Sequence, residues 1–409
     1  MPTSRKLATL RLASAACAVL AYALLAAAGC GGAAVPSSAP SPSLGANHIA
    51  ENARESLASF DKAFYSGTAG SGYYRLSEAG GMADFWKEAE MIETAEDYYR
   101  YTRDAAYKQL VLALCNGFTA KYGSDWTKQY KGGRSGRYLG SRANDDIMWM
   151  VIASARAYQI TGTAAYRQMA ARNFEAAYSR SWSSDFSGGI WWRTATGHAY
   201  RAEKNTTTNA PAAIAACVLY EDFHQPQYLS RAEALYAWER GTLYDAATGR
   251  VFDHIRYTES GGTRTYRTRF SYNQGSFIGA ATLLYAITHK HAYYADARRA
   301  LDYARAHMTT AGILTDPGAT PGQDTGGFKG IFARWAVRFA RDNRVGAYDA
   351  WFRRNAGVVW VNRNARDLMG LKWDTPTSEG RLYAWDCSSG VAMLETLLPA
   401  TPPRSPSAG

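Results

Sequence analysis

The chain alternates between two kinds of apolar helical pattern that are separated by short turns. Five stretches each lie between two such patterns, with a tyrosine near the start of the second: "YTRDAAYKQ", "ITGTAAYRQ", "FHQPQYLS", "ITHKHAYYAD" and "RDNRVGAYDAW". Stretches of this kind are typical of the turns of helical hairpins. The first helices of the pairs are predicted to start 55 to 64 residues apart, near Asp84, Asn144, Thr208, Ser271, Gly326 and Trp385. Each interval accommodates two helices and their loops.

The two helices of each pair differ in where they carry charge. The first helices, such as "APAAIAACVLY" and "GSFIGAATLLYAI", have few charges, which is typical of helices buried on all sides. The second helices, such as "YADARRALDYARAHM", are charged on one face and suit an outer layer. The segment "ENARESLASFDKAFY" adds one more helix at the start and brings the expected total to twelve. Six hairpins can form an open solenoid or a closed ring. The buried first helices favour closure, so we predict an all-α fold, an (α/α)6 barrel with inner and outer helix rings.

The first residues have the composition of an export signal. Residues 1–29 begin with basic residues and continue with an apolar stretch, which predicts a signal peptide rather than a membrane span. Ala28 and Gly29, directly before Cys30, resemble a bacterial lipobox, which implies a lipid on Cys30 that anchors the protein to the membrane. An ordinary cleaved signal near the same place is the alternative. Both interpretations predict that the protein lies outside the cytoplasm.

One folded domain is predicted between two segments that cannot form a core. Residues 30–47 and 399–409 are rich in small residues, Pro and Ser, which predicts a flexible linker and a disordered tail. The domain over 48–398 belongs to a chain with 47% hydrophobic residues, enough for one large core. The net charge of +11 is scattered rather than clustered, so we expect no nucleic-acid partner. We expect the domain to act as a monomer.

Metal and disulfide chemistry are not indicated. Within the domain, Cys115, Cys217 and Cys387 are widely separated and contain no C-x-x-C pair, so each is expected to be a small buried residue. His289 and His291 lie in a predicted outer turn, away from the other polar candidates. No phosphate-binding loop is present in the sequence. We therefore expect no metal and no cofactor.

Polar and aromatic residues gather at the predicted starts of the inner helices, which would open into one common cavity. These residues are Trp86, Glu90, Asn144, Asp145, Asp146, Asn209, Tyr272, Asn273, Gln274, Lys329 and Asp386. A pocket with a few polar groups on an apolar scaffold is typical of a small-molecule site. Flat aromatic faces and paired hydrogen-bond donors and acceptors match a sugar.

Asp145 and Asp146 stand side by side at one of these starts. Such a pair is usually a capping device that interacts with the helix dipole. Asn144, however, can serve as the cap and leave both carboxylates facing the cavity. Two carboxylates a few ångströms apart raise one pKa, while the helix amides hold the other group ionised. One acid and one anion are what glycoside hydrolysis needs, although the residues alone do not assign the two roles.

Four ordered motifs resemble glycoside hydrolase family 76, the α-1,6-mannanases. They are "NDDIMWM", "GGIWWR" at 188–193, "YNQGSFIGA" at 272–280 and "GGFKGIFARW" at 326–335. The resemblance implies an (α/α)6 barrel and cleavage with retention of configuration. It further implies Asp145 as nucleophile and Asp146 as general acid/base. Met150, where the family often has a second tryptophan, and the segment "DFWKEAE" depart from the family pattern and concern the shape of the subsites.

Aromatic residues near the pair are expected to hold sugar rings. Trp191 and Trp192 would form a stacking wall for mannose, with one of the two instead covering the barrel core. Trp86, Asn144 and Trp149 are further expected substrate contacts.

Six more polar residues complete the candidate site: Tyr272, Asn273, Gln274, Lys329, Arg334 and Asp386. For some of them a structural role is an alternative. Asn273 could merely cap its helix, and Asp386 could be either a cap or a sugar contact. Lys329 and Arg334 could bind hydroxyls or keep Asp146 charged, although basic residues in such places often only neutralise nearby acids.

These observations predict an exported, endo-acting α-1,6-mannanase that hydrolyses its substrate with retention. Its partner would be an α-mannan polysaccharide or a mannose-containing glycolipid. A transglycosidase of the same family is one alternative, and a mannan-binding lipoprotein without catalytic activity is another. A uronate-specific hydrolase or lyase would need a basic cluster, for which the candidate cavity offers mainly Lys329 and Arg334.

Overall fold

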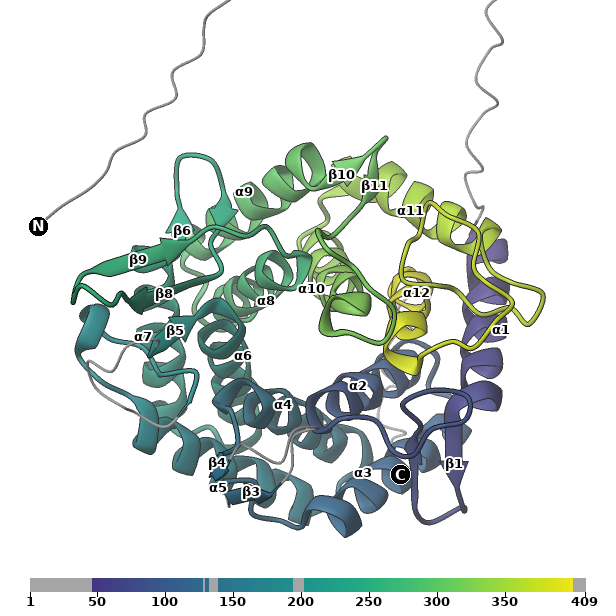
Figure 1. Cartoon of the computed structure of the whole chain (residues 1–409), viewed down its shortest axis with the longest axis horizontal. Helices are drawn as coiled ribbons and strands as arrows, with labels where there is room; N and C mark the ends of the chain where they lie inside the picture. The colour runs from purple at the N-terminus through teal and green to yellow at the C-terminus, as the bar shows by residue number, and fades with distance from the viewer. Residues whose placement is uncertain (1–45, 128, 132–138, 194–201, 400–409) are drawn as a thin grey trace, which may run out of the picture. The chain divides into compact units, whose positions relative to one another are not determined.

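Twelve α-helices in two concentric rings form the described part of the chain (Figure 1). The structure is a computed structural model that describes residues 46–127, 129–131, 139–193 and 202–399. The architecture confirms the predicted (α/α)6 barrel. The predicted signal, the Cys30 anchor, nearly all of the linker and nearly all of the tail lie outside these ranges. Among the helices within them, none combines the length and the apolar character that crossing a membrane requires.

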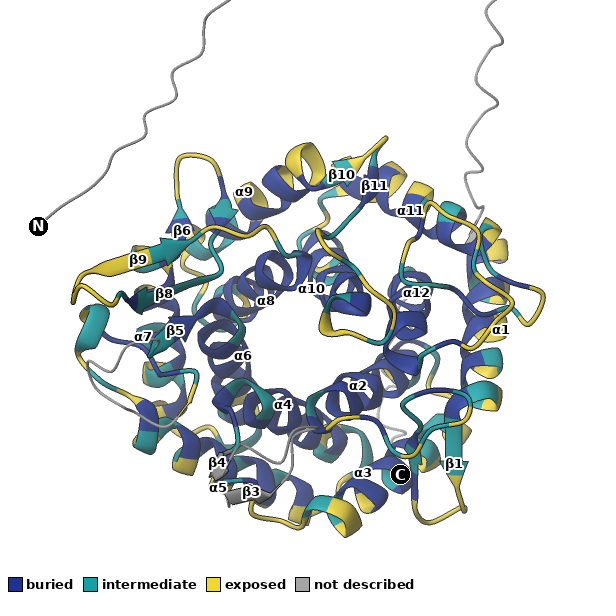
Figure 2. Cartoon of the chain, viewed as in Figure 1, coloured by how far each residue is buried: buried dark blue, intermediate teal, exposed yellow. Residues whose placement is uncertain are grey.

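The inner ring consists of helices that pack side by side in chain order, with the last one packing on the first. Most of their residues are buried, which confirms the sequence interpretation (Figure 2). Each helix starts within two residues of the predicted position. The inner helices are α2 (Phe85–Thr102), α4 (Asn144–Thr161), α6 (Thr206–Phe223), α8 (Ser271–Thr288), α10 (Phe328–Asp342) and α12 (Ala384–Glu395).

The outer ring consists of helices that expose one face and bury the other (Figure 2). Five of them each follow an inner helix along the chain, while the first helix of the fold packs against the last inner helix and closes the ring. The outer helices are α1 (Ala46–Phe64), α3 (Ala105–Tyr122), α5 (Ala164–Ser181), α7 (Pro226–Thr242), α9 (His291–His307) and α11 (Asp349–Val361).

Four of the inner helices end in the same way. The residue that follows the helix is left-handed, with φ of 58° at Arg103, 77° at Gly162, 54° at His224 and 57° at His289, and its N–H bonds to the helix carbonyl four residues back. This geometry terminates a helix and reverses the chain within two residues. It explains why the turns recognised in the sequence are so similar.

Close helix packing depends on glycine in α8. A Cβ atom at Gly275 would lie 2.5 Å from the Cα atom of Phe332 in α10, and one at Gly279 would lie 2.5 Å from the Trp335 ring. Real side chains do not approach so closely, so glycine allows the two backbones to come together. These glycines belong to the segment "YNQGSFIGA".

Short antiparallel sheets connect the helices, and the sequence analysis did not predict them. The largest has the strand order β5–β8–β9, in which Asn205 pairs with His254 and His254 pairs with Tyr266. The others are the hairpins β1–β2, β3–β4, β6–β7 and β10–β11. The strands are β1 (Tyr65–Gly67), β2 (Gly72–Tyr74), β3 (Gln129–Lys131), β4 (Leu139–Ser141), β5 (Glu203–Asn205), β6 (Tyr244–Asp245), β7 (Arg250–Val251), β8 (His254–Tyr257), β9 (Thr263–Tyr266), β10 (Thr309–Thr310) and β11 (Ile313–Leu314).

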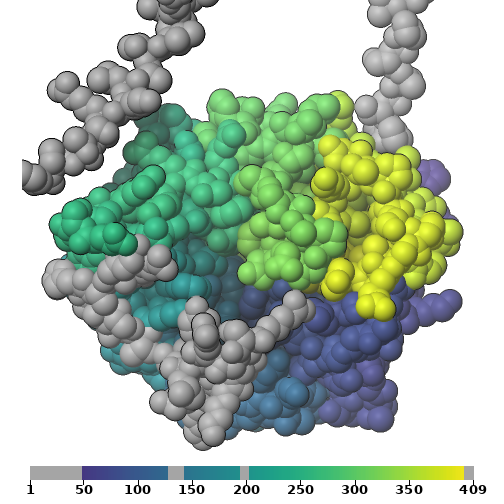
Figure 3. Space-filling model, in the orientation of Figure 1, coloured from purple at the N-terminus to yellow at the C-terminus, as the bar shows by residue number. Residues whose placement is uncertain are grey.

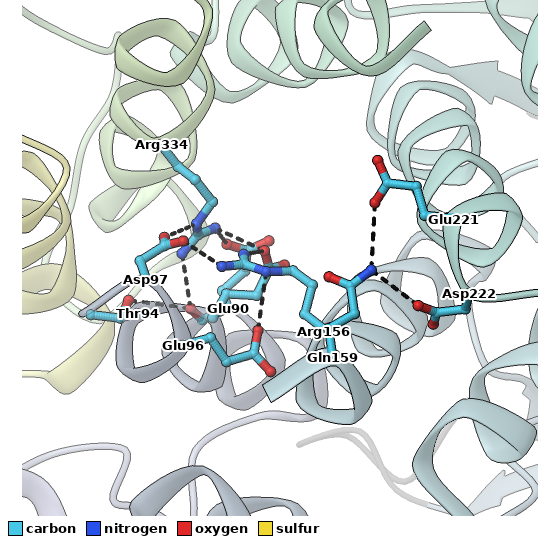
Figure 4. A network of polar contacts seen from close by, with 10 residues as sticks. Glu90, Thr94, Glu96, Asp97, Arg156, Gln159, Glu221, Asp222 and Arg334 are labelled. Atoms are coloured by element: carbon cyan, nitrogen blue, oxygen red, sulfur yellow. Dashed lines mark hydrogen bonds and ion pairs between the residues drawn. The ribbon is translucent and has the colours of Figure 1, made fainter. Parts of the chain in front are cut away.

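Charged side chains form a network in the middle of the barrel (Figure 4). The Arg334 guanidinium of α10 lies 2.6 Å from Glu90 and 2.5 Å from Asp97, both on α2. The Arg156 guanidinium of α4 pairs with Asp97 and Glu93. All five side chains are at most 7% exposed. The two arginines therefore join three inner helices through ion pairs that water does not screen.

Candidate active site

The starts of the inner helices surround a cavity of about 270 Å³. Strand β5, the start of strand β8 and the residue before it contribute to the wall, as do the residues directly before α10. Aromatic rings alternate with carboxylates and other polar groups around it. The lining residues are Trp86, Asp145, Asp146, Trp149, Trp192, Glu203, Asn205, Thr207, Asp253, His254, Tyr272, Asp324, Phe328 and Ile331.

Asp145 and Asp146 lie in the first turn of α4 and both face this cavity. One carboxylate oxygen of Asp145 accepts a hydrogen bond from the backbone N–H of Asp146 at 3.0 Å. The other accepts one from the indole Nε1–H of Trp192, also at 3.0 Å. These two donors fix the orientation of the Asp145 carboxylate and favour its ionised form.

The expected capping role of Asn144 is wrong, because the residue before the helix is Ala143 and Asn144 is already helical. The Asn144 side chain is fully buried, and its Nδ2 donates to the Ser181 hydroxyl at 2.5 Å and to the Trp191 carbonyl at 2.8 Å. Its carbonyl oxygen accepts from the Arg180 guanidinium at 2.6 Å. Asn144 therefore attaches the start of α4 to α5 and to the tryptophan loop, and it does not line the cavity.

The two aspartates have raised pKa values. Burial, followed by the charge of Asp146, raises the pKa of Asp145 well above its usual range, while its two hydrogen bonds oppose the shift. Burial also raises the pKa of Asp146 to about 6, although Arg142 and Arg193 lower it. Two interacting carboxyls titrate as a pair and share a proton. The pKa of Asp145 is raised further than that of Asp146, which places the shared proton on Asp145, whereas the two hydrogen bonds to Asp145 favour the opposite placement, with the proton on Asp146.

A second group of polar residues contributes to the same cavity. The Asp253 carboxylate accepts hydrogen bonds from the Asn273 amide at 2.9 Å and from the Tyr272 hydroxyl at 3.4 Å. Its other oxygen lies 2.9 Å from Nδ1 of His254. Nε2 of His254 lies 3.7 Å from a Glu203 carboxylate oxygen. Donors and acceptors thus alternate along this wall, as the binding of sugar hydroxyls requires.

Aromatic side chains complete the cavity. Trp86, Trp149 and Trp192 line it, and the Trp86 ring packs against Trp385 with centroids 4.9 Å apart. Trp191 is only 1% exposed and packs on Phe186 instead. Of the two neighbouring tryptophans, one therefore faces the cavity and the other belongs to the core, as expected from the sequence.

Several candidates lie outside the cavity, and some of them bond to other parts of the protein instead. Gln274 accepts from the Val251 N–H at 3.1 Å and donates to the Ala300 carbonyl at 2.9 Å. Asn273 reaches the cavity only through Asp253. The residues that do not line it are Glu90, Asn144, Trp191, Asn209, Asn273, Gln274, Lys329, Arg334 and Asp386.

The positions of Arg334 and Asp386 follow from their partners. Arg334 is fixed in the central ion-pair network, so it cannot hold Asp146 charged; Arg142 and Arg193 have that effect instead. Asp386 accepts from the Gly322 N–H at 2.9 Å and thereby attaches the segment before α10 to the start of α12. That segment brings Asp324 to the cavity.

Sequence reasoning missed the contribution of the β5–β8–β9 sheet and of the segment before α10. The missed lining residues are Glu203, Asn205, Thr207, Asp253, His254, Asp324, Phe328 and Ile331. A signal was available, because "HIRY" and "TRTY" flank the turn-rich stretch "TESGG", which is typical of a hairpin. Polar residues next to such a hairpin were candidates for the cavity wall.

A barrel of this kind, with a half-buried carboxylate pair in a cavity lined by tryptophans and polar groups, is the arrangement of a glycoside hydrolase. The chain belongs to glycosyl hydrolase family 76, whose family model matches residues 49–402. This result confirms the resemblance found in the sequence. A search of the curated proteins finds no match to the chain.

Solved structures share the fold over most of the chain. The α-1,6-mannanase of Salegentibacter sp. HEL1_6 is 28% identical with a TM-score of 0.74, and the match covers 85% of this chain and 98% of that protein. An inactive variant of it, with two consecutive aspartates replaced by asparagine, forms a complex with α-1,6-mannotriose (27% identity, TM-score 0.74, 86% and 99% covered). The Lin0763 protein of Listeria innocua is 25% identical with a TM-score of 0.73, and 85% and 96% of the chains are covered.

Proposed function

We propose that the protein is an endo-acting α-1,6-mannanase that cleaves α-1,6-linked mannan with retention of configuration. The observation that carries this proposal is the Asp145–Asp146 pair at the cavity, with Asp145 held by two N–H donors. A pair of consecutive aspartates is also replaced in the inactive mannotriose-bound variant of the Salegentibacter enzyme. The substrate is an α-mannan polysaccharide or a mannose-containing glycolipid.

In the first step, Asp145 attacks the anomeric carbon while Asp146 gives its proton to the glycosidic oxygen that leaves. The Trp192 and Asp146 N–H groups keep the attacking carboxylate in place. In the second step, Asp146, now ionised, removes a proton from water, and the resulting hydroxide displaces Asp145 from the sugar. The pKa of about 6 at Asp146 suits a group that must both give and take a proton.

We further propose that the enzyme is exported, anchored to the membrane through a lipid on Cys30, and monomeric. The leader composition and the lipobox-like sequence before Cys30 support this. Labelling with radioactive palmitate, compared between the natural chain and Cys30→Ser, tests the anchor. Equal labelling of the two chains would contradict it.

The activity is tested on unbranched α-1,6-mannan, with products followed by size and the released anomer by proton NMR. We expect short oligomers released first as the α-anomer, and loss of activity in Asp145→Asn and Asp146→Asn. Azide separates the two roles on an α-mannoside with an activated aryl leaving group, which departs without a proton: Asp146→Ala should regain turnover and give the α-glycosyl azide, because the covalent intermediate still forms. Rescue that yields the β-azide from Asp146→Ala would reverse the roles. An intact polymer that still binds would favour a binding protein without catalytic activity, and products longer than the substrate would favour a transglycosidase.

A further inference from the structure

A second cavity of about 440 Å³ lies beside the catalytic cavity at the same end of the barrel. Both cavities use the start of α10, where Phe328 lines the catalytic cavity and the next residue, Lys329, lines the second. The segments before α10 and before α12 that form its walls lie side by side in light green and yellow (Figures 1 and 3). The lining residues are Thr315, Asp316, Gly318, Ala319, Lys329, Leu371, Lys372, Asp374 and Thr375.

A buried lysine lies at the bottom of this second cavity. Lys329 is 4% exposed, and its ammonium lies 4.9 Å from the Trp373 ring centroid and donates to the Leu371 carbonyl. Among the described residues, this carbonyl is the one hydrogen-bond acceptor of the ammonium. An ammonium has three N–H donors, so two remain for a ligand. Burying a charge is costly unless its donors are used.

The remaining groups determine the class of ligand. Asp316 accepts from the Ser271 N–H at 2.6 Å and from its hydroxyl at 2.5 Å, and each carboxylate oxygen retains a lone pair. Asp316 and Asp374 would repel an anion, while Lys329 and Lys372 would repel a cation. None of the lining residues is aromatic, so a flat apolar ligand has no surface to stack on. Two donors and several acceptors with balanced charge fit a neutral, hydroxyl-rich molecule.

We propose that this cavity is an accessory binding site for a mannose unit of the polysaccharide, distinct from the catalytic cavity. The inference rests on the proposed function, because it takes the ligand from the substrate. A polymer that enters the catalytic cavity can place another unit or a branch on the far side of the segment 315–327. Vicinal hydroxyls of that unit would bridge the Lys329 ammonium and the carboxylates of Asp316 and Asp374. The site would add affinity for long chains and leave the chemistry unchanged.

The test compares a long and a short substrate in Lys372→Ala/Asp374→Ala, a double variant that keeps the net charge. Both side chains are exposed, so the fold should persist. Lys329→Met is the second variant, and Glu55→Ala/Lys62→Ala, exposed on α1, is the charge-matched control. Loss of a few hydrogen bonds should raise KM for α-1,6-mannan about fivefold to tenfold. We expect kcat, the kinetics on α-1,6-mannotetraose and the control to stay within about twofold.

An unchanged KM for the polymer in both variants would overturn the accessory site. So would an equal loss on polymer and tetraose, which indicates damage to the catalytic cavity. If the unaltered protein fails to cut the polymer, the proposed function falls. Affinity electrophoresis in mannan then tests the accessory binding site independently of catalysis. Slower migration of the unaltered protein than of the double variant supports the accessory site, and equal migration of the two refutes it.

Discussion

The central ion-pair network offers a quantitative test of how the barrel is held together. Arg156 contacts three carboxylates of α2: Glu93, Asp97 and, at 3.4 Å, Glu96. Arg156→Met keeps the length of the side chain and removes its charge. Glu93 and Asp97 would then keep their ion pairs with Arg334 in a buried environment, and Glu96 would lose its ion pair with Arg156. Breaking a buried ion pair from one side costs about 3 to 5 kcal/mol.

For a folded domain of this size, that loss lowers the melting temperature by about 4 to 7 °C. The loss of stability in Arg156→Met should depend on pH. Burial and Glu93 already raise the pKa of Glu90 to about 8, and losing Arg156 would raise the pKa of the neighbouring carboxyls further. A raised carboxyl pKa means that the folded state binds more protons, so stability falls as pH increases. The decrease in melting temperature caused by Arg156→Met should therefore be larger at pH 8 than at pH 5.5.

Differential scanning fluorimetry at the two pH values measures this effect. The matched control is Arg338→Met on the same ring, because Arg338 pairs with the half-exposed Asp342 at 3.3 Å. Such a surface pair contributes at most about 1 kcal/mol, so the control should melt within about 2 °C of the unaltered protein. A loss below about 2 °C for Arg156→Met at pH 8, or a deficit that grows on acidification, would refute the reasoning.

Three further predictions concern the cavity and its support. The kcat/KM for mannan should fall as pH rises through about 6, because Asp146 must be protonated to act as acid; a profile that is flat from pH 5 to 8 would contradict this. Trp192→Phe removes the indole donor to Asp145 and should lower kcat about 10- to 100-fold with little change in melting temperature. An unchanged kcat would show that this hydrogen bond does not contribute to catalysis. Lys204→Met removes donors to Ser183 and to the Gly188 carbonyl and should lower the melting temperature by about 3 to 5 °C in fluorimetry; a smaller change would mean that this loop is held by other contacts.

The helix rings were predictable because their signals are local. Charge on one face, apolar character all round and short tyrosine-containing turns each depend on a few consecutive residues. The division of Trp191 and Trp192 into one core residue and one cavity residue was also expected, although the sequence did not say which was which. These features needed no knowledge of distant contacts.

The roles of Arg334, Gln274 and Asn144 were not predictable from position alone. Asn144 and Gln274 lie in the first turns of their helices and Arg334 lies near the middle of α10, but each side chain finds partners from another part of the chain. A clue to Arg334 was present in α2, where the acidic residues at 90, 93 and 97 fall on one face of a predicted inner helix. Acids repeated at this spacing on a buried helix require buried cations.

The ring is closed by α1 packing on α12, without a covalent link between the first and last helices. The end of α1 lies beside the start of α2, where the Arg75 guanidinium bonds to the Ala63 carbonyl and the Tyr74 N–H bonds to Glu88. The start of α1 and the end of α12 therefore lie at the opposite end of the barrel from the cavity. A mechanical load applied to the two chain ends would act first on the contact between α1 and α12. Attachment to a solid support through either end would leave the catalytic opening free.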